Sequence, residues 1–126
     1  MRILLDTHVL LWWLMEDPHL PRAFRAAIAD ADNDVFVSAV THAEIAIKRS
    51  LGKLDAPWIP DELLAENGII GMSFTSSHAR RMLDLPFHHR DPFDRMLIAQ
   101  AALEDVAFAT VDPRCRQYDI RLFEHA

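Results

Sequence analysis

The sequence predicts an α/β fold with a central, mostly parallel sheet of four or five strands and helices on both of its faces. Short apolar runs without polar alternation, such as Ile3-Leu4-Leu5 and Val35-Phe36-Val37, are typical of strands buried on both faces of a parallel sheet. Apolar residues at helical spacing follow each run, and strands that alternate with helices favour this architecture. With 126 residues, 51% of them hydrophobic, the chain is expected to form a single domain over residues 1–126.

The first half of the chain is expected to contain two strands and four helices. The strands are the two apolar runs above. A helix over Val9–Met15 follows the first strand, and a second helix lies between Pro21 and the turn at Asp32-Asn33-Asp34. A third helix follows Ser38 and is predicted to end near Gly52, with one apolar stripe formed by Val40, Ala43, Ile47, Leu51 and Leu54. Asp61 to Asn67 is a small fourth helix, closed by Gly68.

The second half is expected to repeat the alternation of strand and helix. The predicted strands are Ile69–Met72, Val106–Thr110 and a possible edge strand at Arg121–Phe123. The predicted helices run from a cap at Thr75-Ser76-Ser77 through Leu83, from Asp91-Pro92 to about Asp105, and briefly after Asp112-Pro113.

Composition limits the classes of function. A formal net charge of −6 argues against a non-specific nucleic-acid coat protein, but it permits a nucleic-acid enzyme whose acids are neutralised by metal. The lone Cys115 cannot form an internal disulfide. Val9–Met15 is bracketed by Asp6 and Glu16 and lacks a following small-residue cleavage site, which argues against a signal peptide. No segment approaches the roughly 20 apolar residues of a membrane span. We therefore expect a cytoplasmic protein without a membrane partner.

Two acids stand at informative places in the first half. Asp6 ends the first strand, at the sheet edge where open α/β sheets bind ligands, although it could instead cap the following helix. Glu44 falls on the apolar stripe of the third helix, where a charge is costly unless it is paired or bound to metal. The alternative is a capping box from Thr41 to Glu44, which requires the helix to begin at Thr41 rather than after Ser38.

Two further acids lie in equivalent places in the second half. Asp94 shares a helix face with Leu97 and Ile98, which the alternative role of a first-turn acid does not explain. Asp112 follows the strand Val106–Thr110, and an acid in this position, taken alone, is more often a helix cap than a ligand. Asp91 is interpreted as a cap rather than a ligand.

Basic side chains near these acids have simpler interpretations. Lys48 is spaced to pair with Glu44 across one helical turn. His8, His88 and His89 have no partner at zinc-ligand spacing, so they are interpreted as polar loop or substrate-side residues.

Together, Asp6, Glu44, Asp94 and Asp112 predict a metal site. A parallel sheet gathers such positions at one edge, where neighbouring carboxylates repel one another unless a cation lies between them. Oxygen ligands favour Mg²⁺, with Mn²⁺ as the alternative, over zinc. A hard metal at an open edge suits phosphodiester hydrolysis.

The residues around these acids resemble those of a known family. The motifs are Leu4-Leu5-Asp6-Thr7-His8, Val37-Ser38-Ala39 with Glu44-Ile45-Ala46-Ile47-Lys48, His89-Arg90-Asp91-Pro92-Phe93-Asp94-Arg95 and Thr110-Val111-Asp112. In this order and spacing they resemble the PIN domain and, more narrowly, the VapC-type toxins of bacterial type II toxin–antitoxin pairs.

This resemblance implies a three-layer α/β/α sandwich and a metal-dependent endoribonuclease that acts on RNA. It also implies a homodimer that is blocked by a small cognate antitoxin. The family's three core acids, which are both catalytic and metal-binding, correspond to Asp6, Glu44 and Asp94, and a more variable fourth corresponds to Asp112. Hydroxyl residues that support the acids correspond to Thr7, Ser38 and Thr110.

Two other classes of protein compete with the nuclease. A receiver-like phosphoacceptor domain should show paired acids after its first strand and a lysine after its last, and neither is present here. A non-catalytic α/β binding module would not need Glu44 on an apolar stripe.

The first helix carries a further expectation about partners. Val9–Met15 is apolar all round, whereas a helix on one face of a sheet needs a single apolar stripe. We expect its surplus face, together with Trp58, to meet an antitoxin helix or a second copy, unless the next helix covers it.

Overall fold

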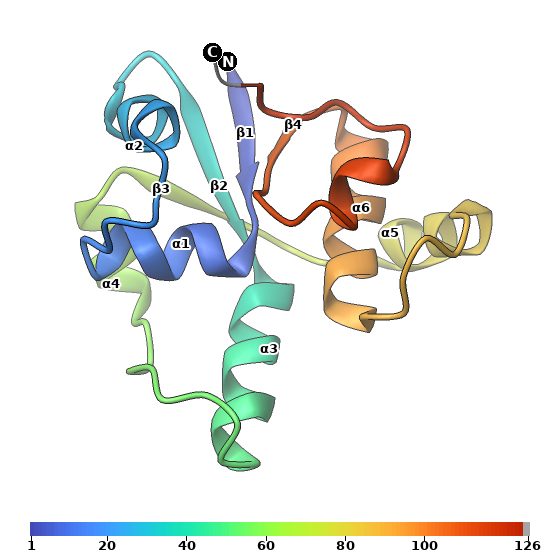
Figure 1. Ribbon diagram of the computed structural model, residues 1–126, viewed down its shortest axis with the longest axis horizontal. Helices are drawn as coiled ribbons and strands as arrows, with labels where there is room; N and C mark the ends of the chain where they lie inside the picture. The colour runs from blue at the N-terminus through green and yellow to red at the C-terminus, as the bar shows by residue number, and fades with distance from the viewer. Residues whose placement is uncertain (125–126) are drawn as a thin grey trace.

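The computed structural model describes residues 1–124, and its centre is a four-stranded parallel sheet (Figure 1). The strands lie in the order β3-β2-β1-β4, and every neighbouring pair is parallel. Their bounds are Arg2–Leu5 for β1, Asp34–Ser38 for β2, Ile69–Met72 for β3 and Ala107–Ala109 for β4. The possible edge strand at residues 121–123 is reduced to a single bridge between Phe108 and Leu122. The predicted parallel sheet is thus confirmed.

Six α-helices and two short 3₁₀ turns connect and follow the strands in the described part of the chain. The α-helices are α1 (Thr7–Leu14), α2 (Arg22–Ala29), α3 (Ala39–Ser50), α4 (Asp61–Glu66), α5 (Ser76–Arg81) and α6 (Pro92–Glu104). The 3₁₀ turns are Met82–Asp84 and Cys115–Gln117. Within residues 1–124, none of the helices is long and apolar enough to cross a membrane.

The sheet separates two apolar cores, which explains why its strands show no polar alternation. Ile3 and Leu5 of β1 point to the core beneath α1, α2 and α4, whereas Leu4 points to the opposite core beneath α6. Because successive side chains of a strand point to opposite faces, both kinds of position must be apolar here. Helices therefore cover both faces, and the predicted three-layer arrangement is confirmed (Figure 1).

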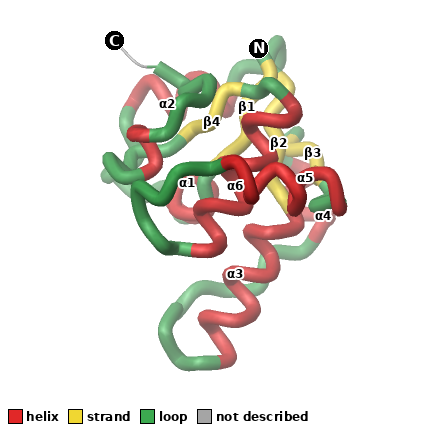
Figure 2. The backbone as a smooth tube through the Cα atoms, turned by 90° about the vertical axis from the view of Figure 1, so that its right-hand side faces the viewer, coloured by secondary structure: helices red, strands yellow, loops and turns green. Residues whose placement is uncertain are grey.

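The apolar stripe predicted for α3 is wrong except at Val40, because Ala43, Ile47 and Leu51 are exposed. Figure 2 shows α3 projecting away from the sheet, so only its beginning is covered by other elements. Its buried residues are Val40, Thr41, Glu44 and Ile45. Ile47 and Leu51 are 46% and 61% exposed. The buried face runs through Thr41, Glu44 and Ile45 and does not include Ala43. Helical spacing identifies residues that share a face, but it does not show which face packs against the protein or how far that contact extends.

The strand order changes direction beside β1. The chain proceeds from β1 to β2 to β3 on one side and then returns to place β4 on the other side of β1. Ligands of open α/β sheets bind at such a switch point, outside the carboxyl ends of the strands. This order also differs from that of receiver-like domains, in which the third strand lies beside the first. The fold therefore disfavours the receiver alternative and directs attention to the ends of β1 and β4.

Candidate active site

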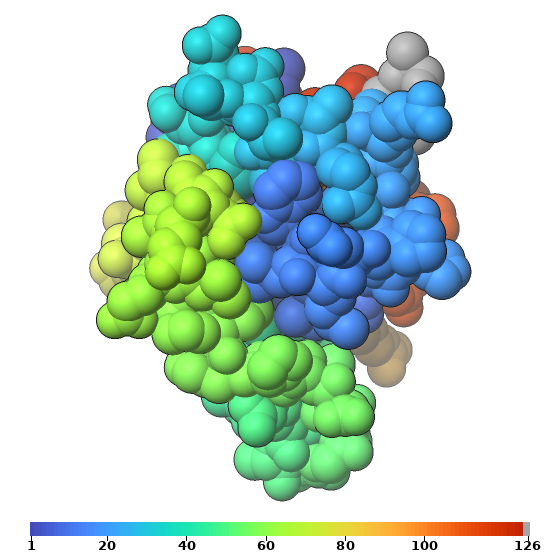
Figure 3. Space-filling view, turned by 90° about the vertical axis from the view of Figure 1, so that its left-hand side faces the viewer, coloured from blue at the N-terminus to red at the C-terminus, as the bar shows by residue number. Residues whose placement is uncertain are grey.

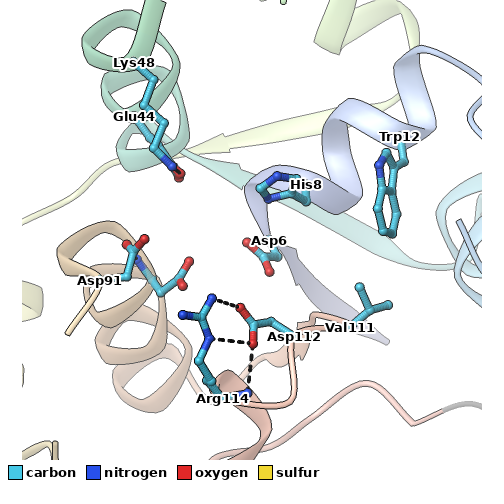
Figure 4. Close-up of a pocket in the computed structure, with 10 residues that line it drawn as sticks. Asp6, His8, Trp12, Glu44, Lys48, Asp91, Val111, Asp112 and Arg114 are labelled. Atoms are coloured by element: carbon cyan, nitrogen blue, oxygen red, sulfur yellow. Dashed lines mark hydrogen bonds and ion pairs between the residues drawn. The ribbon is translucent and has the colours of Figure 1, made fainter. Parts of the chain in front are cut away.

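Four acids from four segments of the chain surround one pocket at the carboxyl ends of β1 and β4 (Figure 4). The cavity has a volume of about 380 Å³. The predicted acids on its wall are Asp6, Glu44, Asp94 and Asp112. Asp91, Lys48 and Arg114 also line it, beside His8, Trp12 and Val111. The fold thus brings the four predicted acids to one place.

Asp6 lies at the centre of this arrangement, between β1 and α1. It holds the N-cap position of α1, but its side chain makes no capping hydrogen bond. Instead its Oδ2 accepts a 2.7 Å hydrogen bond from Thr110 Oγ1. Burial raises the pKa of Asp6 to about 7 although this hydrogen bond lowers it, and nearby acidic charges raise it further. The interpretation of Asp6 as a cap alone is therefore not supported.

Glu44 is buried on the first turns of α3. Ser38 Oγ accepts a 2.9 Å hydrogen bond from the backbone N–H of Val40, so Ser38 is the N-cap and α3 begins before Thr41. The alternative of a capping box from Thr41 to Glu44 is therefore wrong. Ser38 supports Glu44 by setting the start of its helix.

Both carboxylate oxygens of Glu44 have partners. Thr7 Oγ1 donates a 2.8 Å hydrogen bond to Oε1 and lies 3.0 Å from Thr41 Oγ1. Lys48 Nζ pairs with Oε2, as its spacing predicts. Burial lowers the pKa of Lys48, but the hydrogen bond to Glu44 raises it, and the net shift is upward. Thr7 and Lys48 thus hold the Glu44 carboxylate in place, and Lys48 also lines the pocket.

Asp94 stands in the first turn of α6. Asp91 caps this helix through a 2.9 Å hydrogen bond from the backbone N–H of Asp94, which confirms its predicted role as a cap. Burial raises the pKa of Asp94, and the charge of Asp91 adds to the rise. His89 Nε2 lies 3.1 Å from Asp94 Oδ2 and lowers that pKa in part.

His89 is more deeply placed than a polar loop residue, which corrects the interpretation of the sequence. It is 9% exposed, and its Nδ1 lies 3.0 Å from Tyr118 Oη. Arg95 Nη1 donates a 2.9 Å hydrogen bond to the same Tyr118 oxygen and a 2.7 Å bond to the carbonyl of Pro86. A buried chain of hydrogen bonds thus runs from Arg95 to Asp94. Sequence spacing offers no signal for it, because Tyr118 is 29 residues from His89.

Asp112 differs from the other acids because its charge is already paired. Its Oδ1 accepts a 2.9 Å hydrogen bond from the backbone N–H of Arg114, and the Arg114 guanidinium lies 2.8 Å from Oδ2. These hydrogen bonds lower the pKa of Asp112. Figure 4 shows the Arg114 side chain beside the Asp112 carboxylate, with dashed lines joining the two.

The pocket carries more negative than positive charge. Five acids line it (Asp6, Glu44, Asp91, Asp94 and Asp112), against the two cationic side chains of Lys48 and Arg114. Burial is the main cause of the raised pKa values of Asp6 and Asp94, and the neighbouring acidic charges raise them further. Oxygen donors with unbalanced charge at a solvent-open pocket fit a hard divalent cation such as Mg²⁺ or Mn²⁺.

The chain is similar to known proteins over nearly its whole length. A family model described as the PIN domain matches residues 3–121. The chain is 32% identical over 122 residues to Ribonuclease VapC22 of Mycobacterium tuberculosis, which covers 92% of this chain and 91% of that protein.

Two solved structures share the fold. VapBC2 of Rickettsia felis, bound to a DNA fragment from its promoter, has a TM-score of 0.67 at 12% identity and covers 98% of both chains. FitAcB of Neisseria gonorrhoeae has a TM-score of 0.65 at 19% identity and covers 97% of this chain and 96% of the other.

Proposed function

We propose that this chain, which belongs to the PIN domain family, is a metal-dependent endoribonuclease and the toxin of a type II toxin–antitoxin pair. The observation that carries the proposal is the convergence of Asp6, Glu44 and Asp94 on one acidic pocket. The similarity to a protein named as a ribonuclease supports RNA as the substrate. The reaction we propose is hydrolysis of an RNA phosphodiester bond.

The acids of the pocket are the groups that would hold the metal. Asp6 offers a carboxylate that is hydrogen-bonded to Thr110, and Asp94 offers one that lies beside His89. Glu44 offers a carboxylate shared with Lys48, and Asp112 offers one shared with Arg114. We propose Mg²⁺, with Mn²⁺ as the alternative. When bound, such an ion lowers the pKa of a water molecule and stabilises charge on the attacked phosphate.

The remaining residues of the site would position these acids and receive the substrate. Thr110 donates a hydrogen bond to one carboxylate oxygen of Asp6, and Thr7 donates one to a carboxylate oxygen of Glu44. The Arg114 side chain is 60% exposed and stands at the rim, where a guanidinium can bind a phosphate oxygen. The chain thus supplies positive charge beside the acids although its net charge is negative.

We further propose a cognate antitoxin protein as the partner, a homodimer as the assembly and the cytoplasm as the location. Two structurally similar chains come from structures of VapBC2 and FitAB bound to DNA fragments, which supports an assembly of this kind. The surplus face of α1 remains the surface that we assign to the partner. Trp12, Trp13 and Leu14 are only partly buried, Met15 is 57% exposed, and α1 reaches the surface in Figure 3.

The test of the proposed function is a cleavage assay on RNA with purified protein. Cleavage is expected to require Mg²⁺ or Mn²⁺ and to stop in excess EDTA, and by family resemblance the products carry 5′-phosphate and 3′-hydroxyl ends. Undiminished cleavage in EDTA, or products with 2′,3′-cyclic phosphates, would contradict it.

A further inference from the structure

A second set of metal-ligating atoms lies directly behind Asp94. His89, Asp94 and Cys115 each offer one ligand atom, and these atoms all lie within 4.8 Å of one another. His89 Nε2 is 3.1 Å from Asp94 Oδ2 and 3.8 Å from Cys115 Sγ. The three side chains come from a loop, from α6 and from a 3₁₀ turn, so the fold rather than local sequence brings them together.

The chemistry of these donors differs from that of the acidic pocket. An imidazole, a carboxylate and a thiol are the ligands that zinc takes in proteins, whereas Mg²⁺ takes oxygen. Tetrahedral zinc with bonds of about 2.0–2.3 Å places its ligand atoms about 3.3–3.6 Å apart. The separations from His89 Nε2 to Asp94 Oδ2 and to Cys115 Sγ, 3.1 and 3.8 Å, bracket this range, and all three ligand atoms lie within 4.8 Å of one another. Small movements of the three side chains would bring these atoms to the spacing of zinc ligands.

Charge balance allows such an ion at a buried place. Cys115 is wholly buried, and burial raises the pKa of its thiol, so without metal it is protonated. A dication bound by one thiolate and one carboxylate forms a neutral group, which avoids the cost of an isolated buried charge. Asp94 lines the pocket, and an ion can therefore enter from solvent past its carboxylate.

The hydrogen bonds behind His89 suit metal binding. A histidine that ligates through Nε2 must carry its proton on Nδ1, and ligating histidines almost always donate that proton to an oxygen. Tyr118 Oη lies 3.0 Å from Nδ1 and also accepts a hydrogen bond from Arg95, which leaves it a second lone pair.

We propose that His89, Asp94 and Cys115 form a binding site for Zn²⁺ or a similarly thiophilic dication. Binding exchanges the Cys115 S–H bond for a sulfur–metal bond and releases one proton to solvent, while the His89 proton resides on Nδ1. The site takes Asp94 Oδ2 as a ligand and so neutralises one acid of the pocket, which weakens binding of Mg²⁺ there. Zn²⁺ therefore inhibits RNA cleavage, and this consequence alone rests on the proposed function.

The direct test is titration of the metal-free protein with Cd²⁺, a spectroscopic probe for thiolate ligands. Cys115 is the only cysteine in the sequence, so ultraviolet charge-transfer absorption from a cadmium–thiolate bond reports this residue alone. We expect the band to saturate at one Cd²⁺ per chain, with release of a proton and a rise in melting temperature. His89→Gln is expected to weaken Cd²⁺ binding by at least about tenfold. A folded wild-type protein without the band at saturating Cd²⁺ would overturn the site.

The matched test of inhibition compares wild type with Cys115→Ser in excess Mg²⁺. Micromolar Zn²⁺ is expected to inhibit wild type and to spare Cys115→Ser, with Cys115→Ala in its place if the serine variant does not fold. Equal inhibition of both proteins would overturn the inhibitory role. A thiolate band without RNA cleavage under any condition would refute the proposed function and still support the metal site. RNA cleavage without the thiolate band would support the proposed function and refute the metal site.

Discussion

Thr110 Oγ1 donates a 2.7 Å hydrogen bond to Asp6 Oδ2 and thereby joins the carboxyl ends of β4 and β1. Both residues are buried, and the bond lies where the strand order changes direction. The Asp6 N–H donates to the carbonyl of Ala109, so backbone and side chain connect the same two strands. The acid at the centre of the pocket is therefore positioned by the sheet itself rather than by a loop.

Thr110→Val should loosen this connection without changing the shape of the side chain. Asp6 would lose the hydrogen bond that opposes the effect of burial on its pKa, so more of it would be protonated at neutral pH. We expect Mg²⁺ affinity to fall about 10–100-fold. The measurement is the Mg²⁺ concentration at half-maximal melting-temperature shift, and Thr110→Ser is the matched control that should stay near wild type. Equal affinity in all three proteins would contradict the role of this bond.

The pH dependence of stability should reveal Asp6 in the metal-free protein. Burial raises the pKa of Asp6 from its ordinary value of 3.8 to about 7 in the folded protein, so between these values the folded state binds more protons than the unfolded state. Stability must then fall as pH rises through this window, by up to a few kcal/mol. The raised pKa of Asp94 acts in the same direction.

Asp6→Asn isolates this contribution, because asparagine keeps the shape and cannot titrate. Urea unfolding of both proteins between about pH 4 and pH 8 measures it. The stability of wild type relative to Asp6→Asn should decline steadily with pH. A constant difference would show that the pKa of Asp6 is not raised.

Lys48→Met should destabilise the metal-free protein because Glu44 would stay buried without its ionic partner. Removing one member of a buried, hydrogen-bonded pair leaves an uncompensated charge, and we expect a loss of about 1–3 kcal/mol. Added Mg²⁺ should restore part of this loss by supplying positive charge beside Glu44. Lys53→Met, at an exposed lysine, is the control for charge alone. Equal effects of the two substitutions would argue against the pairing.

The exposed part of α1 should be covered in the assembled complex. Trp12 and Trp13 are partly buried in the isolated chain, so acrylamide should quench their fluorescence to an intermediate degree. Trp58 is 50% exposed and is replaced by phenylalanine to isolate the signal of the other two. Binding of the proposed cognate antitoxin is expected to reduce the quenching. Unchanged quenching in a complex of proven stoichiometry would place the partner surface elsewhere.

The sequence was sufficient to predict the sheet and the positions of the four acids. Apolar runs that end in polar residues locate the carboxyl ends of strands, and a parallel sheet must gather those ends at one edge. Asp6 and Asp112 are 106 residues apart and yet line the same pocket for this reason.

Other contacts could not be predicted because no local period encodes them. The approach of His89 to Tyr118 and Cys115 depends on how a loop packs against a 3₁₀ turn 26 or more residues later. The exposure of Ile47 depends on which face of α3 packs against the protein and on where the helix leaves it, and helical spacing gives neither. The Arg114 bond to Asp112 is local, but only the fold shows that it neutralises one acid of the pocket.

The central claim is that Asp6 and Asp94 hold a divalent cation that cleavage of RNA requires. The most direct measurement is the melting of wild type, Asp6→Asn and Asp94→Asn with and without Mg²⁺, beside the RNA cleavage assay, with Asp55→Asn as an exposed-acid control. Each pocket variant should lose cleavage and most of the Mg²⁺-dependent rise in melting temperature. Each should also keep or gain metal-free stability, by up to about 1–2 kcal/mol, because one repelling charge is removed. Retained cleavage with an unchanged response to Mg²⁺ would contradict the account.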